Sequence, residues 1–350
     1  MGGRSFTALR RIMPQLVILA IVLGMNAIIL QDFFSISFQN GRLFGNVIDV
    51  LNRAAPTALL AVGMTLVIAT KGIDLSVGSV IAIAGATAAS LVVGGAPWGV
   101  AVLGALAAGA VCGLWNGFLV AVLRIQPIVA TLVLMVAGRG IAQLITEGKI
   151  LTFHNEGLIH LGAGTILGLP TPIWNWVLLG IGVTYLVRRT ALGLLIEAIG
   201  INEASSRLAG INSRVLLVMV YLVSGLCAAI AGVIVAADIK GADANNAGLW
   251  LELDAILAVV IGGNSLLGGR FSIIASLLGA LIIQSVNSII LLSGMPSEFN
   301  LVIKALIIFV ILVIQSPRVG HKIYLARAAL GSTPEQKHDR AQEKLAGGAS

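Results

Sequence analysis

The residues best suited to hold a polar ligand lie together in residues 238–254, DIKGADANNAGLWLELD, which concentrate carboxylates, amides and an indole. Carboxylates and amides replace the hydrogen bonds that sugar hydroxyls otherwise make with water, and each unmet bond costs roughly a few kcal/mol. An indole packs on the C–H face of a sugar ring. We therefore predict that the path of a sugar is lined by Asp243, Asn245, Asn246 and Trp250. The alternatives are a solvated loop with an interfacial Trp, or a docking surface for another protein.

A second polar stretch, residues 197–214 (EAIGINEASSRLAGINSR), lies between two apolar runs of membrane length. Asn202 is suited to cap a short helix. Apolar residues recur there at helical spacing, and polar residues occupy the other face: Ile201, Ala204, Leu208 and Ile211 against Glu203, Ser206 and Arg207. The pattern predicts a small amphipathic helix at a membrane surface. Its short length and mixed charge argue against strong lipid binding, so a soluble partner is the favoured interpretation.

Signatures of catalysis are absent from the sequence. There is no GxxxxGK[ST] phosphate-binding loop, because Gly148-Lys149 is followed by Ile150. The histidines form no HExxH motif or Cys/His cluster. Cys112 and Cys227 lie in apolar runs, where a thiol acts as a small hydrophobe. We expect a chain that is not an enzyme and binds no metal or cofactor of its own.

Composition excludes a soluble protein. Of the 350 residues 58% are hydrophobic and only 11% are charged, too few to cover a wet surface. The formal charge of +7 comes from basic residues spread between apolar runs, which indicates membrane topology and not nucleic-acid binding.

Apolar runs near the roughly 17 to 25 residues that cross a bilayer predict an all-α polytopic membrane protein of about ten helices. The runs are residues 14–31, 54–70, 74–94, 98–123, 127–146, 172–187, 215–237, 251–266, 271–293 and 300–316. The run 251–266 is short and starts with Glu252 and Asp254, so it is interpreted as either a half-helix or a re-entrant segment.

Basic residues orient this topology. With the N-terminus inside, most lysines and arginines fall in cytoplasmic loops. The sequence then divides into a cytoplasmic N-terminus (1–13), a transmembrane domain (14–316) and a cytoplasmic tail (317–350). Arg139 and Lys304 lie within runs, where each either lines an aqueous path or serves as a structural ion pair or snorkelling residue.

Two glycine-interrupted stretches, GIDLSVGS from Gly72 and LDAILAVVIGGNSLLGG from Leu253, form a weak internal echo. A duplicated architecture with broken helices is one interpretation. Close packing of helices at small residues is the other. Asp74, in the first stretch, either lines the substrate path or caps the helix that starts at Leu75.

Four blocks in this order resemble the ribose-type permease subunits of ABC importers: GIDLSVGS (72–79), PIVATLVLMVAGRGIAQLITEG (127–148), EAIGINEASSRLAGIN (197–212) and ELDAILAVVIGGNSLLGGR (252–270). The resemblance covers about residues 45 to 316. LNRAAPTALLAVGMTLVIAT (51–70) and GADANNAGLWLELDAI (241–256) look most like the galactofuranose permease subgroup.

This resemblance implies the ABC importer permease fold in a bacterial inner-membrane protein, and the basic residues place both of its termini in the cytoplasm. It implies three partners: a second permease chain, identical or related, a cytoplasmic ATPase with tandem nucleotide-binding domains that binds the ATP, and a periplasmic sugar-binding protein. The family's segment that couples to the ATPase corresponds to Glu197, Gly200, Asn202, Glu203, Arg207 and Gly210.

The expected function is therefore ATP-driven import of a monosaccharide, galactofuranose or a related sugar. One alternative is an ion- or proton-coupled secondary transporter, although Arg139 and Lys304 do not form the acid relay of a proton-driven carrier. A second alternative is an ABC permease for a nucleoside or a branched-chain amino acid.

Overall fold

The computed structural model describes residues 2–30, 32–39 and 41–292, together with residues 301, 302, 305, 306, 309, 310 and 313; side chains are described from residue 12 onward. Most of the predicted run 300–316 and the whole tail 317–350 lie outside the described residues. The chain divides into two units, Met1–Leu301 and Val302–Ser350, and the account below concerns the first.

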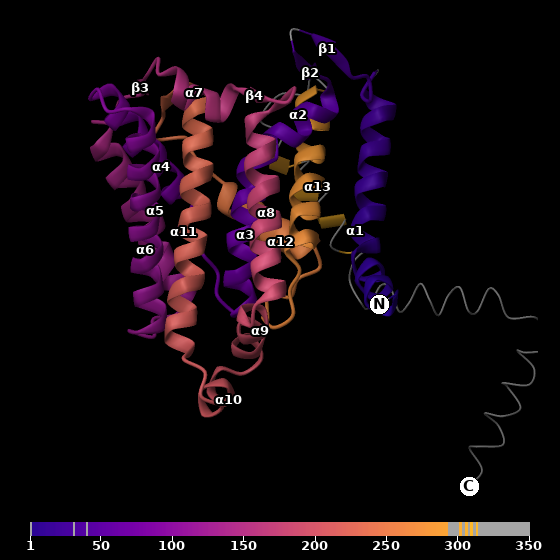
Figure 1. The fold of residues 1–350 in the computed structure, drawn as a ribbon, viewed down its shortest axis with the longest axis vertical. Helices are drawn as coiled ribbons and strands as arrows, with labels where there is room; N and C mark the ends of the chain where they lie inside the picture. The colour runs from indigo at the N-terminus through magenta and orange to yellow at the C-terminus, as the bar shows by residue number, and fades with distance from the viewer. Residues whose placement is uncertain are drawn as a thin grey trace, which may run out of the picture. The chain divides into compact units, whose positions relative to one another are not determined.

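The first unit is a bundle of α-helices (Figure 1). Its helices are α1 (Gly2–Ile29), α2 (Asn46–Arg53), α3 (Ala55–Ala69), α4 (Val77–Val93), α5 (Trp98–Ala121), α6 (Pro127–Ile145), α7 (Glu156–Ala163), α8 (Thr171–Arg189), α9 (Leu192–Ile201), α10 (Glu203–Leu208), α11 (Ser213–Asp238), α12 (Leu251–Ile261) and α13 (Ile273–Leu292). The mostly helical fold confirms the predicted fold class.

Short strands join the loops in three antiparallel pairs. These are β1 (Ser37–Gln39) with β2 (Arg42–Phe44), β3 (Leu151–Thr152) with β6 (Gly241–Ala242), and β4 (Thr165–Ile166) with β5 (Leu169–Pro170). The β3–β6 pair, in which Leu151 faces Ala242, attaches the segment after α6 to the segment after α11.

Helix α11 is the central element and packs against α3, α4 and α5. Small residues allow close approach: a Cβ atom at Gly109 of α5 would lie 2.6 Å from the carbonyl oxygen of Gly225 in α11. Close backbone contact at small residues is the usual way that helices associate in membranes, where the hydrophobic effect does not drive helices together. Packing by glycine therefore explains part of the glycine content.

The predicted number of about ten crossings is not confirmed. Among the described residues, five helices are long and apolar enough to cross a membrane, or up to seven if each bent pair forms one span. Helices α3, α4 and α12 have 15, 17 and 11 residues, fewer than the ~20 that a span needs. Helix α8 qualifies only together with α9, and most of the run 300–316 lies outside the described residues. Helix α12 thus matches the half-helix interpretation of 251–266.

The two bent pairs are α2 with α3, at 42°, and α8 with α9, at 79°. Helices α2, α7 and α9 were not predicted, because a search for membrane-length runs overlooks helices of 8 to 10 residues. The sharp bend after α8 redirects the chain toward α10 (Figure 1).

Candidate functional site

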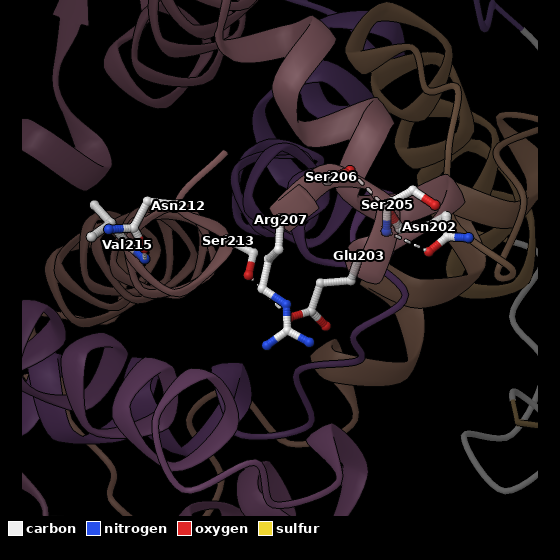
Figure 2. Close-up of polar contacts among 8 residues, drawn as sticks. All are labelled: Asn202, Glu203, Ser205, Ser206, Arg207, Asn212, Ser213 and Val215. Carbon is white, nitrogen blue, oxygen red and sulfur yellow. Dashed lines mark hydrogen bonds and ion pairs between the residues drawn. The ribbon is translucent and has the colours of Figure 1, made fainter. Parts of the chain in front are cut away.

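The polar stretch 197–214 folds as the end of α9, the short helix α10 and the start of α11 (Figure 2). The Asn202 side chain accepts a hydrogen bond from the Ser205 amide at 3.0 Å, so the predicted cap is confirmed. The Glu203 carboxylate accepts a bond from the Ser213 hydroxyl at 3.0 Å and lies 4.0 Å from Arg207 Nε. These bonds hold α10 against the start of α11. We call residues 197–214, from the end of α9 to the start of α11, the hairpin.

The hairpin exposes apolar side chains at its tip. Ile201 is 66% and Leu208 is 91% exposed. Of the predicted docking residues, Asn202, Glu203, Arg207 and Gly210 are exposed, Glu197 is partly buried and Gly200 is buried. A tip with exposed apolar side chains beside charged groups suits contact with a soluble partner.

Gly200 lies where the end of α9 meets two breaks between helices. We call residues 70–76, between α3 and α4, the first break, and residues 262–272, between α12 and α13, the second break. The Gly269 amide donates a hydrogen bond to the Ala69 carbonyl at 2.9 Å. A Cβ atom at Gly200 would overlap that carbonyl oxygen and lie 2.6 Å from the Gly269 nitrogen. Lys71 also donates to the Ile201 carbonyl at 3.0 Å. The hairpin therefore rests directly on both breaks.

The first break is held by Asp74, which is 1% exposed. One carboxylate oxygen accepts bonds from the Ser76 amide at 3.1 Å and the Ser76 hydroxyl at 2.6 Å, and the other accepts from the Ser224 hydroxyl of α11 at 2.8 Å. Asn116 of α5 donates to the Ser76 hydroxyl at 2.8 Å. In this conformation Asp74 organises the start of α4 and ties it to α5 and α11.

The second break is held in a similar way by Asn264, which is 6% exposed. Its side chain accepts a bond from the Ser272 amide at 2.7 Å and donates to the Ser276 hydroxyl at 2.8 Å. Thr65 of α3 donates to the same Ser276 hydroxyl at 2.6 Å. The two sequence stretches of the internal echo thus contain helix breaks that are each organised by one buried Asp or Asn.

A cavity of about 320 Å³ opens between the hairpin and the first break. Its charged lining residues are Lys71, Arg124, Glu203 and Arg207, and Tyr221 of α11 also lines it. The hairpin, the first break and the link between α5 and α6 therefore surround a polar hollow rather than a closed core.

The predicted sugar path lies at the other end of the bundle, where β3 and β6 pair (Figure 1). We call residues 241–250 the outer loop. Asp243 accepts bonds from the Asn245 amide at 3.0 Å, the Asn246 amide at 3.2 Å and the Asn246 side chain at 2.7 Å. The hydrogen bond from the Asn246 side chain stabilises the ionised carboxylate and is the main reason that the pKa of Asp243 lies below its ordinary value. The loop brings three of the predicted residues together, but Asp243 is occupied by its own neighbours.

Arg139 of α6 fixes the outer loop from the side. Its guanidinium donates to the carbonyls of Ala244 at 3.1 Å and Ala247 at 2.6 Å, and Gln143, one turn later, donates to the Asn245 side chain at 2.7 Å. Sequence reasoning singled out Arg139 but missed these partners. Its membrane position is explained because backbone carbonyls satisfy the charge.

Trp250 directly precedes α12 and has left-handed backbone geometry with φ of 67°. Trp250 is 52% exposed and thus accessible to a ligand or partner. Such a conformation costs a non-glycine residue roughly 1–3 kcal/mol and is often found at binding sites.

The membrane-length helices identify an integral membrane protein, and the two breaks that meet a polar hairpin give it an interrupted-helix interior. The chain matches the family described as the permease component of the branched-chain amino acid transport system over residues 46–312, and it belongs to this family.

Relatives in this family agree with the resemblance seen in the sequence. The chain is 60% identical over 306 residues to the galactofuranose transporter permease protein YtfT of Escherichia coli K12, covering 87% of this chain and 90% of the relative. It is 43% identical over 295 residues to the fructose import permease protein FruF of Bifidobacterium longum, covering 83% of each. It is 38% identical over 323 residues to the ribose import permease protein RbsC of E. coli K12, covering 91% and 98%. No solved structure gives a significant match.

Proposed function

We propose that this chain is the translocation subunit of an ATP-driven importer that carries a monosaccharide, galactofuranose or a close relative, across a bacterial inner membrane. The observation that carries the proposal is 60% identity, over 87% of the chain, to a permease named for galactofuranose. Relatives named for fructose and ribose support a sugar as the class of cargo.

The proposed partners follow from the division of labour in such importers. A separate cytoplasmic ATPase with two nucleotide-binding domains binds and hydrolyses ATP, a second permease chain completes the path, and a periplasmic protein delivers the sugar. The exposed tip of the hairpin, with Leu208 beside Glu203 and Arg207, supports docking of the ATPase there. Glu197, Asn202 and Gly210 complete this proposed surface, and Gly200 supports it from below.

The contacts at Gly200 suggest how ATPase movement reaches the path. A push on α10 is passed through the end of α9 to the Ala69 carbonyl and the Gly269 amide, because no space separates them from Gly200. Movement of both breaks would shift α4 and α12, and the outer loop directly precedes α12. ATP shifts this equilibrium because it binds the two ATPase states with different affinity.

The outer loop is the proposed place where the sugar enters, with Asp243, Asn245, Asn246 and Trp250 as contacts. Asn246 is exposed, and its amide oxygen is available for a sugar hydroxyl while its nitrogen holds Asp243. Asp74, in the first break, is the less direct candidate: it holds the start of α4 through Ser76, and we propose that it shapes the path through α4.

Uptake by cells lacking endogenous sugar importers tests the proposal. Cells that express this chain with its ATPase and binding protein should accumulate labelled galactofuranose, and an excess of unlabelled galactofuranose should compete better than ribose, leucine or adenosine. If only leucine or only adenosine competed, the cargo would be a branched-chain amino acid or a nucleoside and not a sugar. If collapse of the proton gradient abolished uptake at once while ATP stayed constant, a secondary transporter would be the better interpretation.

A further inference from the structure

Helices α8 and α13 pack against each other (Figure 1). An apolar groove of about 400 Å³ is lined by side chains of these two helices. On α8 it extends from Trp176 to Arg189, a length of ~20 Å at 1.5 Å per residue. A Cβ atom at Gly180 would lie 2.7 Å from the Leu277 side chain, so this glycine lets the two helices meet at the floor. The groove is in the size range of about 300–1,000 Å³ that is typical of ligand sites.

Charged groups occur at one end of this groove only. Arg188 and Arg189 line that end, and the Arg189 guanidinium lies 5.7 Å from the centre of the Tyr185 ring. Both arginines are exposed, and neither forms an ion pair with an acid within the part of the chain that the structure describes. The other lining residues are uncharged, and their polar groups are the Thr184 and Tyr185 hydroxyls and the Trp176 indole N–H, which donates to the Leu51 carbonyl.

Thr184 adds a second, independent sign of a ligand. Its hydroxyl oxygen is buried and has no hydrogen-bond partner. A hydroxyl in a helix normally donates to the carbonyl four residues earlier, so an unused buried hydroxyl has a cost. Thr184 and Arg188 also line a small adjoining cavity of about 20 Å³ that reaches Ser272, roughly enough for one water molecule.

We propose that this groove binds one anionic phospholipid, with an acyl chain along Val177 and Ile181 and the phosphate between Arg188 and Arg189. A long apolar surface with unpaired cations at one end is complementary to such a lipid, which has apolar acyl chains and an anionic headgroup. The segment 300–316 of this chain is a poorer occupant, because it carries Lys304 and no acid, and would leave the arginines unmatched. The topology predicted from the sequence places these arginines at the cytoplasmic leaflet.

Native mass spectrometry of the purified full chain with added phosphatidylglycerol or phosphatidylcholine tests this proposal without any assay of transport. We expect the wild type to retain one phosphatidylglycerol in preference to phosphatidylcholine. The double variant Arg188→Gln, Arg189→Gln should lose this preference by on the order of 30-fold, since each cation near an anionic lipid contributes about fivefold. Val177→Trp should displace the lipid while both charges remain, and Arg124→Gln, outside the groove, should bind as the wild type does.

Three outcomes would overturn the proposal. Equal retention of both lipids by the wild type would remove the charge argument. Retention that is unaffected by Val177→Trp and by the double arginine variant would place any bound lipid elsewhere. If the wild type were a dimer and the Val177→Trp variant a monomer with unaltered lipid retention, the groove would be the contact surface of a second copy.

Discussion

At the scale of single residues, the outer loop depends on two charged side chains with different roles. Arg139 holds the loop from α6 through two carbonyls, and Asp243 folds it locally through three N–H groups. Within the described residues, neither side chain forms an ion pair. Charge thus serves to fix the backbone around the proposed sugar contacts.

Replacement of Arg139 by Gln should loosen the outer loop, because two partly buried hydrogen bonds to backbone carbonyls are lost or weakened. Hydrogen bonds to charged groups contribute about 1.5–3 kcal/mol each, so we expect a fall in thermal stability of a few °C and a loss of uptake larger than tenfold. Lys149→Gln is the matched control, since Lys149 is 77% exposed and makes only a weak surface pair at 3.9 Å. Unchanged stability and uptake in the Arg139 variant would contradict the role given to this residue.

The pH dependence of stability should report on Asp243. Since its pKa in the folded chain is lowered, chiefly by the Asn246 side chain, its contribution is present above the unfolded value of about 3.9 and is lost as pH falls through the folded pKa. Thermal unfolding of the wild type and of Asp243→Asn should therefore differ by a constant amount above about pH 5. The difference should shrink at lower pH, and a difference that grew on acidification would have the wrong sign.

At the scale of elements, the structure is organised by the meeting of the hairpin with the two breaks. The α10 helix and its Asn202 cap were predictable because the signals are local: a capping residue and apolar spacing within residues 201–211. The contact of Gly200 with Ala69 and Gly269 was not, because it joins three segments far apart in the chain. For the same reason Gly200 was assigned to the docking surface, whereas the structure buries it.

Replacement of Gly200 by Ala should separate the hairpin from the breaks. The new methyl group would overlap the Ala69 carbonyl, which is backbone and cannot rotate away, so a backbone shift costing about 1–3 kcal/mol is expected. Thermal unfolding should show this loss, and ATP-dependent uptake should fall further than stability alone explains. Gly182→Ala in α8, where nothing lies within 4 Å of the added atom, is the control and should keep full uptake.

The turn at Gly210 makes a different prediction, because its φ of 85° limits it by backbone geometry while the space around it is open. Gly210→Asn should keep uptake, since Asn tolerates left-handed geometry. Gly210→Val should uncouple ATP hydrolysis from uptake, because left-handed geometry costs a β-branched residue about 1–2 kcal/mol and the turn between α10 and α11 would distort to avoid it. Measurement of sugar-stimulated ATPase activity and uptake on the same preparations checks this. Normal coupling in the Val variant would move the docking site away from this turn.

At the scale of the whole molecule, membrane-length runs and the family resemblance indicated a helical permease, and both the helical fold and the family are confirmed. The predicted number of about ten crossings is not confirmed, because α3, α4 and α12 are too short to be counted as spans and most of the run 300–316 lies outside the described residues. Apolar composition alone does not distinguish a buried half-helix from a full span, since both read as continuous hydrophobic sequence. The breaks that shorten these helices are also the places where the hairpin makes contact.

The central claim is that this chain provides the sugar path and the hairpin that moves it, while a separate ATPase subunit supplies the energy. Sugar uptake into proteoliposomes, with the chain reconstituted alone or together with its ATPase and binding protein, tests the claim most directly. We predict accumulation against a gradient only for the complete complex with ATP. Accumulation by the chain alone, without nucleotide, would contradict the claim.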